Sequence, residues 1–293
     1  MRTHAALVLA CLAFPAAAAA PQDAIGPRDP ARLALAEVLA DKGVLVDFDA
    51  RACAIDVDVL VKEDLLEYLL VGPGGAGHES LFETDVQPSL LNTGMIALDV
   101  QPGQNAVWET VEPRPSLEER RAGKKPYTIH KPTGDGFLMY AAWREGDETF
   151  LYRVEDLVAN LRTGRAMVRH RWVYLGSKFL PADDPADPPV FAADAERNLI
   201  NLAYFQAGHT LLTGALDDCA DQSIWIANPW LLPHRGATVR LVFAREPLEE
   251  LPAAWAETLP VVTAPEVSGD EVGAGAEPSG PGGGGGGGSG DER

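Results

Sequence analysis

Residues 54–61 read Ala-Ile-Asp-Val-Asp-Val-Leu-Val, and this stretch decides the fold more than any other. Apolar and polar side chains alternate along it, as they do in a strand with one buried and one exposed face. Residues 44–49 alternate in the same way. We therefore predict a β-hairpin over residues 44–61.

Strand-like runs continue along the rest of the chain, and helical patterns are few and short. The strand candidates are residues 65–71, 81–82 (a return strand), 136–144, 149–153, 172–180, 199–205, 223–226 and 237–244. The helix candidates are residues 30–43, 88–98 and a short turn in 154–161. The spacing is not that of βαβ units, so we predict the α+β class: a mainly antiparallel β-sheet with a few short helices in a single domain.

The first residues have the pattern of a secretory signal peptide. Arg2 precedes an apolar core over residues 5–14, and alanines occupy residues 16–20. Small residues at this distance from such a core mark a cleavage site, which we place after Ala19. We therefore expect an exported protein that is periplasmic or secreted.

The patterns described so far divide the chain into four regions. They are a signal peptide (1–19), an N-terminal linker and helix (20–43), the main domain (44–251), and a disordered, glycine-rich acidic tail (262–293). The tail contains seven consecutive glycines, which bury little and lose much backbone entropy on ordering.

Charge and hydropathy restrict the partners. The formal net charge is −19, and such a surface repels phosphate backbones, so we expect no nucleic acid partner. Beyond the signal peptide no apolar run reaches the roughly 18 residues that a membrane helix needs, so we expect no transmembrane segment after signal removal.

After cleavage the chain keeps two cysteines, Cys53 and Cys219. In an oxidising compartment they can form a disulfide or remain free thiols, and geometry decides between the two. Two cysteines are too few for an all-cysteine iron–sulfur cluster. The sequence identifies no cofactor.

A glycine-rich loop over residues 72–77 satisfies the G-x-G-x-x-G spacing of nucleotide sites. That motif works when a helix follows it, but a strand-like run follows here, and Pro73 removes one backbone N–H. We therefore reject a nucleotide site at this loop.

The loop ends in His78 and Glu79, which place an imidazole and a carboxylate near a loop tip. Together they can ligate a metal or act as a base with its orienting acid. Alternatively, His78 only braces the loop by hydrogen bonds. A second histidine, His170, lies between Arg169 and Arg171, whose charges would lower its pKa; a basic surface turn is the simpler interpretation.

Several motifs together resemble the YdjY domain family of bacterial exported proteins. They are Leu66-Glu67-Tyr68, the glycine loop ending in His78-Glu79-Ser80, Pro88 with the helix to Gly94, Pro102-Gly103, residues 172–179 (Trp-Val-Tyr-Leu-Gly-Ser-Lys-Phe), residues 198–205 and residues 228–243. The resemblance covers residues 44–251. It implies an envelope protein without an assigned reaction, and it singles out His78, Glu79, Trp172, Gly176 and Ser177.

We expect a binding domain for a small molecule or an envelope protein. The candidate ligand contacts are His78, Glu79, Ser80, Trp172, Tyr174, Gly176 and Ser177. The alternatives are a metal-assisted hydrolase, with His78 and Glu79 as ligands, and a redox or metal-handling accessory that uses the same loop. No catalytic residue can be assigned from the sequence.

Overall fold

The structure is a computed structural model that describes residues 26, 28–60, 65–182 and 184–263. These residues belong to one compact unit. The predicted signal peptide and almost all of the predicted tail lie outside the described residues.

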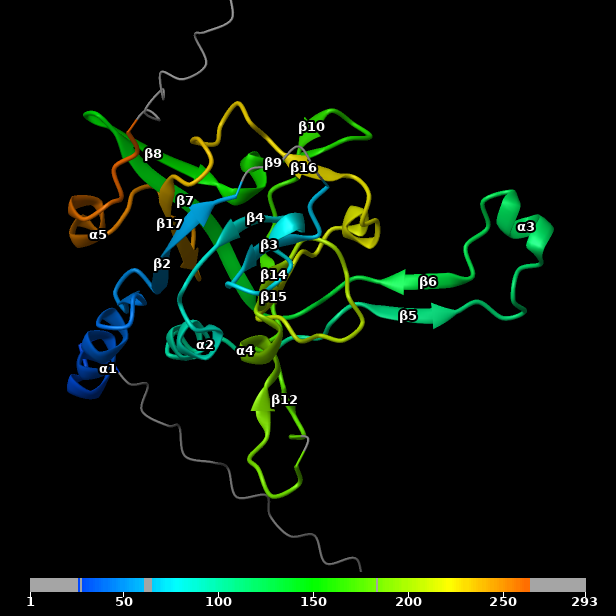
Figure 1. The fold of residues 1–293 in the computed structure, drawn as a ribbon, viewed down its shortest axis with the longest axis horizontal. Helices are drawn as coiled ribbons and strands as arrows, with labels where there is room; N and C mark the ends of the chain where they lie inside the picture. The colour runs from blue at the N-terminus through cyan, green and yellow to red at the C-terminus, as the bar shows by residue number, and fades with distance from the viewer. Residues whose placement is uncertain (1–25, 27, 61–64, 183, 264–293) are drawn as a thin grey trace, which may run out of the picture. The chain divides into compact units, whose positions relative to one another are not determined.

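The chain is mainly β, and one sheet organises it (Figure 1). Its ten strands are β1 (Leu45–Asp47), β2 (Ala52–Val59), β3 (Tyr68–Val71), β4 (Ser80–Glu83), β7 (Gly136–Glu145), β8 (Glu148–Arg153), β11 (Trp172–Tyr174), β14 (Asn198–Asn201), β15 (Leu212–Thr213) and β17 (Thr238–Ala244). Eight of them run in the order β2-β17-β7-β11-β15-β14-β3-β4. A pairing of β4 with β2 (Asp58 with Glu83, Val59 with Phe82) closes the sheet on itself.

The closed sheet is mixed, so the predicted antiparallel arrangement is only partly correct. The predicted hairpin at 44–61 is confirmed as antiparallel β1 and β2, and the hairpin of β7 and β8 is confirmed as well. β14 pairs with β15 in parallel, and so does β3 with β4. The predicted return strand at 81–82 therefore exists as part of β4, but it runs in the same direction as β3.

Alternation along β2 explains how the sheet separates two cores. Cys53, Ile55, Val57 and Val59 face the main core, as the period of two requires. Ala52 and Ala54 point the other way, into a smaller cluster under Trp255. The aspartates of β2 lie on this outer side, where Asp56 pairs with Arg240 of β17 at 2.8 Å.

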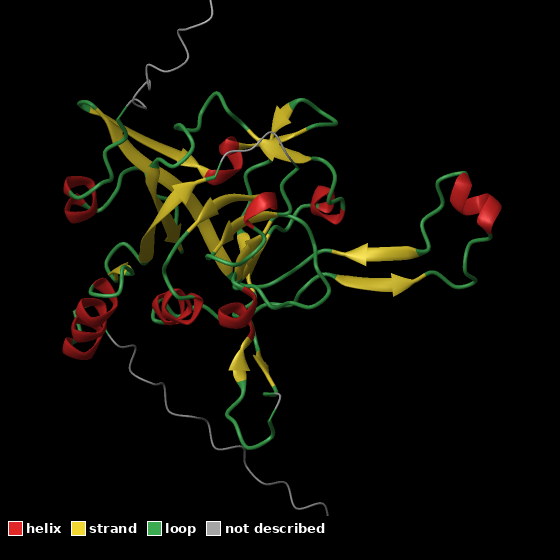
Figure 2. Cartoon of the chain, viewed as in Figure 1, coloured by secondary structure: helices red, strands yellow, loops and turns green. Residues whose placement is uncertain are grey.

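Five short helices accompany the strands in the described residues (Figure 2). They are α1 (Pro30–Ala40), α2 (Pro88–Ile96), α3 (Leu117–Arg121), α4 (Ala192–Glu196) and α5 (Ala253–Glu257), and short 3₁₀ turns lie at η1 (Gly77–Glu79), η2 (Val154–Leu157) and η3 (Asp217–Ala220). The predicted start of α1 is confirmed, because Asp29 accepts the N–H of Ala31 at 2.8 Å with Pro30 in the first turn. None of the described helices is both long and apolar enough to span a bilayer.

Three smaller sheets lie outside the closed sheet. One contains β9 (Val158–Asn160), β10 (Arg165–Ala166) and β16 (Trp225–Ala227). The others are two-stranded hairpins. We call residues 107–130 arm 1, which consists of β5 (Val107–Thr110), α3 and β6 (Tyr127–His130). We call residues 179–191 arm 2, which consists of β12 (Phe179–Leu180), a loop and β13 (Val190–Phe191). Figure 1 shows both hairpins projecting away from the closed sheet.

Candidate functional site

The predicted site at His78 and Glu79 is an exposed ion pair. Both residues lie in the 3₁₀ turn η1, directly before β4, and His78 Nε2 lies 3.0 Å from Glu79 Oε1. The His78 side chain is 73% exposed. Burial and then the nearby Glu79 carboxylate raise the pKa of Glu67, so a third ionisable group lies close to the pair. The His78 and Glu79 side chains therefore contact each other at the surface, with the Glu67 carboxyl nearby.

A metal centre at this pair would need further ligands. Within the described residues, no three or more histidine, cysteine or carboxylate side chains are arranged to hold a metal ion. Zinc sites in proteins have three or four such ligands. Among the described residues, therefore, two of the side chains that the predicted metal site requires lie together, and no third joins them.

The aromatic residues predicted as a wall of this site are core residues. Trp172 and Tyr174 lie in β11, which is not a neighbour of β4 in the closed sheet, and both are buried. The Tyr174 hydroxyl donates to Asn92 Oδ1 of α2 at 2.6 Å, and burial raises its pKa to about 12. Tyr174 therefore links β11 to α2, and neither ring lies beside His78.

The remaining predicted contacts also have structural partners. The Ser80 hydroxyl is buried and donates to the carbonyl of Phe82 at 2.9 Å. Gly176 and Ser177 have φ of 72° and 56°. Ser177 Oγ donates to the carbonyl of His209 at 2.6 Å and accepts the N–H of Ala193 at 3.1 Å. This serine therefore links the end of β11 to α4.

Both described cysteines are free thiols, so the disulfide left open by the sequence is not formed. Cys53 lies in β2 and Cys219 in η3, and both are buried. Burial raises the pKa of Cys53, and it raises the pKa of Cys219 to about 12. Because the thiolate is the reactive form, neither sulfur is suited to redox exchange in the folded protein.

We expect neither thiol to react with a water-soluble aromatic disulfide reagent in native buffer, and both to react once the chain is unfolded in denaturant without reductant. The measurement is the absorbance of the released thiolate from the chain lacking residues 1–19. One rapidly reacting thiol in native buffer, or no reactive thiol in denaturant, would contradict the burial and the free state described above.

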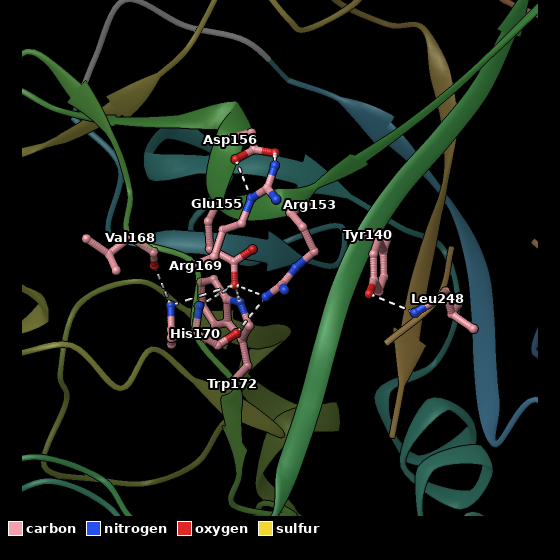
Figure 3. Close-up of polar contacts among 9 residues, drawn as sticks. All are labelled: Tyr140, Arg153, Glu155, Asp156, Val168, Arg169, His170, Trp172 and Leu248. Atoms are coloured by element: carbon pink, nitrogen blue, oxygen red, sulfur yellow. Dashed lines mark hydrogen bonds and ion pairs between the residues drawn. The ribbon is translucent and has the colours of Figure 1, made fainter. Parts of the chain in front are cut away.

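A buried charged cluster that the sequence did not reveal surrounds Glu155 (Figure 3). Glu155 lies in η2, directly after β8, and its side chain is completely buried. Its Oε1 accepts from Arg153 Nη2 at 2.6 Å, from Trp172 Nε1 at 3.0 Å and from the backbone N–H of His170 at 3.2 Å. The carboxylate therefore joins the end of β8 to the start of β11.

Three atoms of this cluster have no hydrogen-bond partner in the described part of the chain. They are Arg153 Nε, Glu155 Oε2 and His170 Nε2. Unpartnered buried polar atoms are rare and call for an explanation. Here the Arg153 guanidinium also stacks over the Tyr140 ring at 5.4 Å, and the His170 ring lies 4.9 Å from that of Trp172. The cluster is thus a packed junction whose arginine and histidine also contact aromatic rings.

The predicted low pKa of His170 is correct in direction, but its main cause is different. Burial is the largest cause of the lowered pKa, and the charge of Arg153 adds to it, while Glu155 opposes it. Arg169, one of the flanking arginines, forms an ion pair with Asp156. The interpretation of a basic surface turn is wrong for His170, whose side chain is only 9% exposed.

This lowered pKa predicts a pH dependence of stability. Below about pH 6.5 the unfolded histidine takes up a proton that the folded His170 resists, so the free energy of unfolding falls with falling pH. We expect His170→Asn to reduce that slope between pH 6.5 and 5, by at most about 1.4 kcal/mol per pH unit. Urea unfolding at several pH values measures it, with the exposed His130→Asn as control. Equal slopes in wild type and His170→Asn would contradict the prediction.

Neither His78 nor Glu79 lines any of three cavities found among the described residues. The volumes are about 450, 410 and 200 Å³. The second lies against one face of the small sheet, where Arg165, Asn160 and Trp225 are direct cross-strand partners. The Trp225 Nε1 has no hydrogen-bond partner among the described residues, but it is shielded from solvent. A small ligand in the cavity would therefore not reach this N–H without a rearrangement.

Arm 1 carries several exposed apolar side chains. Its strands pair only with each other in the described residues, and Trp108 contacts the body of the protein through an edge-to-face contact with Tyr204 at 6.4 Å. Beyond this contact Leu117 is 57% exposed, and Val107 and Tyr127 are exposed as well. Aromatic and aliphatic side chains in this setting are typical of interaction surfaces.

The tip of arm 1 is ordered by its own contacts. Ser116 and Glu119 form a capping box at the start of α3, and Lys124 donates to Glu119 at 3.0 Å. Hydrogen bonds from Lys124 and then Ser116 lower the pKa of Glu119 to about 2. The S-x-x-E spacing at 116–119 is a recognisable helix start, although no helix was predicted for this segment.

The chain matches no family model, no curated protein and no solved structure.

Proposed function

We propose that the chain is an exported bacterial envelope protein that binds a partner protein through arm 1. The observation that supports this most is that arm 1 is structured, packs on the core through Trp108 and Ile129, and yet leaves Val107, Leu117 and Tyr127 exposed. An isolated two-stranded hairpin is marginally stable in water. A hairpin held outside the core adds little to the stability of the fold, so its role is best explained by contacts with another molecule.

The composition of arm 1 suits a protein partner. Its exposed side chains combine Leu117 and Tyr127 with several arginines and lysines. Aromatic residues and arginine are enriched at protein–protein interfaces. Both β5 and β6 also have an open edge in the described residues, which offers main-chain hydrogen bonds to an added strand.

The export and family assignments are part of the same proposal. The signal-like pattern of residues 1–19 supports a periplasmic or secreted location. The order of motifs over residues 44–251 supports membership of the YdjY domain family. Binding of a small molecule at His78 and Glu79 has less support, because the pair is exposed and lines none of the cavities described above.

Neither alternative function gains support from a particular observation. A metal-assisted hydrolase needs a ligand set that the described residues do not assemble around His78 and Glu79. A redox accessory needs an accessible thiolate, and Cys53 and Cys219 are buried with raised pKa values.

Site-specific cross-linking in the producing bacterium tests the proposal. A photo-reactive phenylalanine analogue replaces Leu117 in one strain and Val168 in another. Val168 is 67% exposed but lies outside both arms, so it serves as the matched control. We expect a discrete cross-linked protein adduct at position 117 and none at 168. Equal labelling at both positions, or no adduct at 117, would contradict binding through arm 1.

A further inference from the structure

Arm 1 carries a local excess of positive charge on a strongly acidic chain. Residues 111–126 contain five lysines and arginines against three carboxylates, whereas the whole chain has a net charge of −19. Lys124 is paired with Glu119. The other four cations form no ion pair in the described residues and are exposed: Arg114, Arg120, Arg121 and Lys125. The tip therefore offers unpaired cations beside the exposed Leu117.

Arm 2 has the opposite charge and a matching apolar surface. Residues 179–191 contain no lysine or arginine. Asp184 and Asp187 are exposed and form no ion pair in the described residues. Phe179 is 69% exposed and Val190 is exposed as well. The rings of Phe179 and Phe191 lie 5.4 Å apart and form an apolar base below the acidic loop.

We infer that arm 1 of one copy docks on arm 2 of a second copy of this chain. The inference rests on the proposed function of arm 1 and names its partner. Arm 2 complements arm 1 in two ways. Its carboxylates, which form no ion pair in the described residues, can pair with the cations of arm 1, and its exposed phenylalanine can contact the exposed Leu117. No described ion pair joins the two arms within one chain.

Electrostatics favours this pairing over other contacts between copies. Two molecules with a net charge of −19 repel each other, so contact is least costly where the local charge is positive. Charges are screened beyond about 8 Å at physiological salt. Four strand residues at about 3.3 Å each place the tip of arm 1 roughly 13 Å beyond the base of its hairpin. The negative charge on the rest of its own chain therefore repels an acidic partner at the tip only weakly.

The symmetry of the contact decides which assembly forms. Arm 1 and arm 2 are different surfaces, so a single contact joins two copies head to tail. Two copies can also exchange the contact reciprocally, with each arm 1 on the other's arm 2, which closes a dimer. Both assemblies contain the same arm 1–arm 2 contact, and charge reversal tests that contact in either.

Charge reversal on each arm tests this inference. Self-association is measured by sedimentation equilibrium at 0.15 M salt, on the full chain without residues 1–19. One variant carries Arg114→Glu and Lys125→Glu, which lie outside α3. The other carries Asp184→Lys and Asp187→Lys. We expect the wild type to self-associate, and each variant to do so at least tenfold more weakly. We expect an equimolar mixture of the two variants to associate within about threefold of the wild type, because each then meets an oppositely charged arm. Unchanged thermal unfolding midpoints show that both variants fold.

Two results would overturn the inference. One is a wild type that remains monomeric up to roughly 1 mM, the weak end of the affinity scale. The other is an association that neither reversal weakens or that the mixture does not restore. The cross-linking at position 117 separates this failure from that of the proposed function. An adduct whose mass indicates a different protein supports partner binding and rejects the second copy, whereas no adduct rejects both.

Discussion

Replacing Glu155 by alanine is expected to lower the free energy of unfolding by about 3–5 kcal/mol, the range for breaking a buried ion pair from one side. The side chain is completely buried, and its Oε1 accepts from Arg153, from the Trp172 indole and from the His170 backbone. Alanine would leave a buried guanidinium without its counter-charge and two N–H groups without an acceptor. Urea unfolding measures the loss.

Two further variants make this result specific. Glu155→Gln keeps an acceptor but removes the charge, so its loss falls between those of wild type and Glu155→Ala. Glu109→Ala is the matched control, because Glu109 also forms an ion pair, with His130 at 2.8 Å, but its side chain is 68% exposed. Exposed pairs contribute about 0–1 kcal/mol. Glu155→Ala within 1 kcal/mol of the wild type would show that this cluster does not join β8 to β11.

Replacing Gly136 by alanine is expected to destabilise the fold by more than about 3 kcal/mol. Gly136 begins β7 and pairs with Val173 of β11. A Cβ at this position would lie 1.9 Å from the carbonyl oxygen of Trp172. Since the obstructing atom is backbone, relief requires β7 and β11 to separate, which opens the closed sheet and moves Trp172 away from Glu155.

Gly72→Ala is the control for this substitution. A Cβ at Gly72 would meet its nearest atom, the carbonyl oxygen of Thr84, at an ordinary contact distance of 3.5 Å. We expect a change within about 1 kcal/mol there, measured by the same urea unfolding. If Gly136→Ala were as stable as Gly72→Ala, the register of β7 against β11 described here would be wrong.

Elements that have a clear pattern within a few consecutive residues were predicted correctly. Alternation identified β2, and the Asp29-Pro30 start identified α1. The closure of the sheet could not be predicted in this way. It depends on Val59 of β2 meeting Phe82 of β4, and no local pattern specifies which strands become neighbours. The direction of β4 was mistaken for the same reason.

The buried cluster and the arms were missed for different physical reasons. Charged residues are almost never fully buried, so nothing in the sequence distinguishes Glu155 from an exposed glutamate. Its partners Arg153 and Trp172 come together only through the pairings of β7 with β8 and β11. Only Trp108 in β5 and Ile129 in β6 are partly buried, so the two strands of arm 1 lack the alternation that marks other strands. The strands of arm 2, β12 and β13, have two residues each and are too short to show any alternation.

Excision of the tip of arm 1 separates partner binding from folding. Thr110 and Tyr127 are cross-strand partners, so Asn-Gly in place of residues 111–126 closes the hairpin with a two-residue turn. The photo-reactive residue replaces Val107 in both the intact and the shortened chain. We predict an adduct for the intact chain only, and the same thermal unfolding midpoint for both chains. An adduct that persists without the tip, or a midpoint that falls with its removal, would contradict a partner-binding arm displayed by an independent fold.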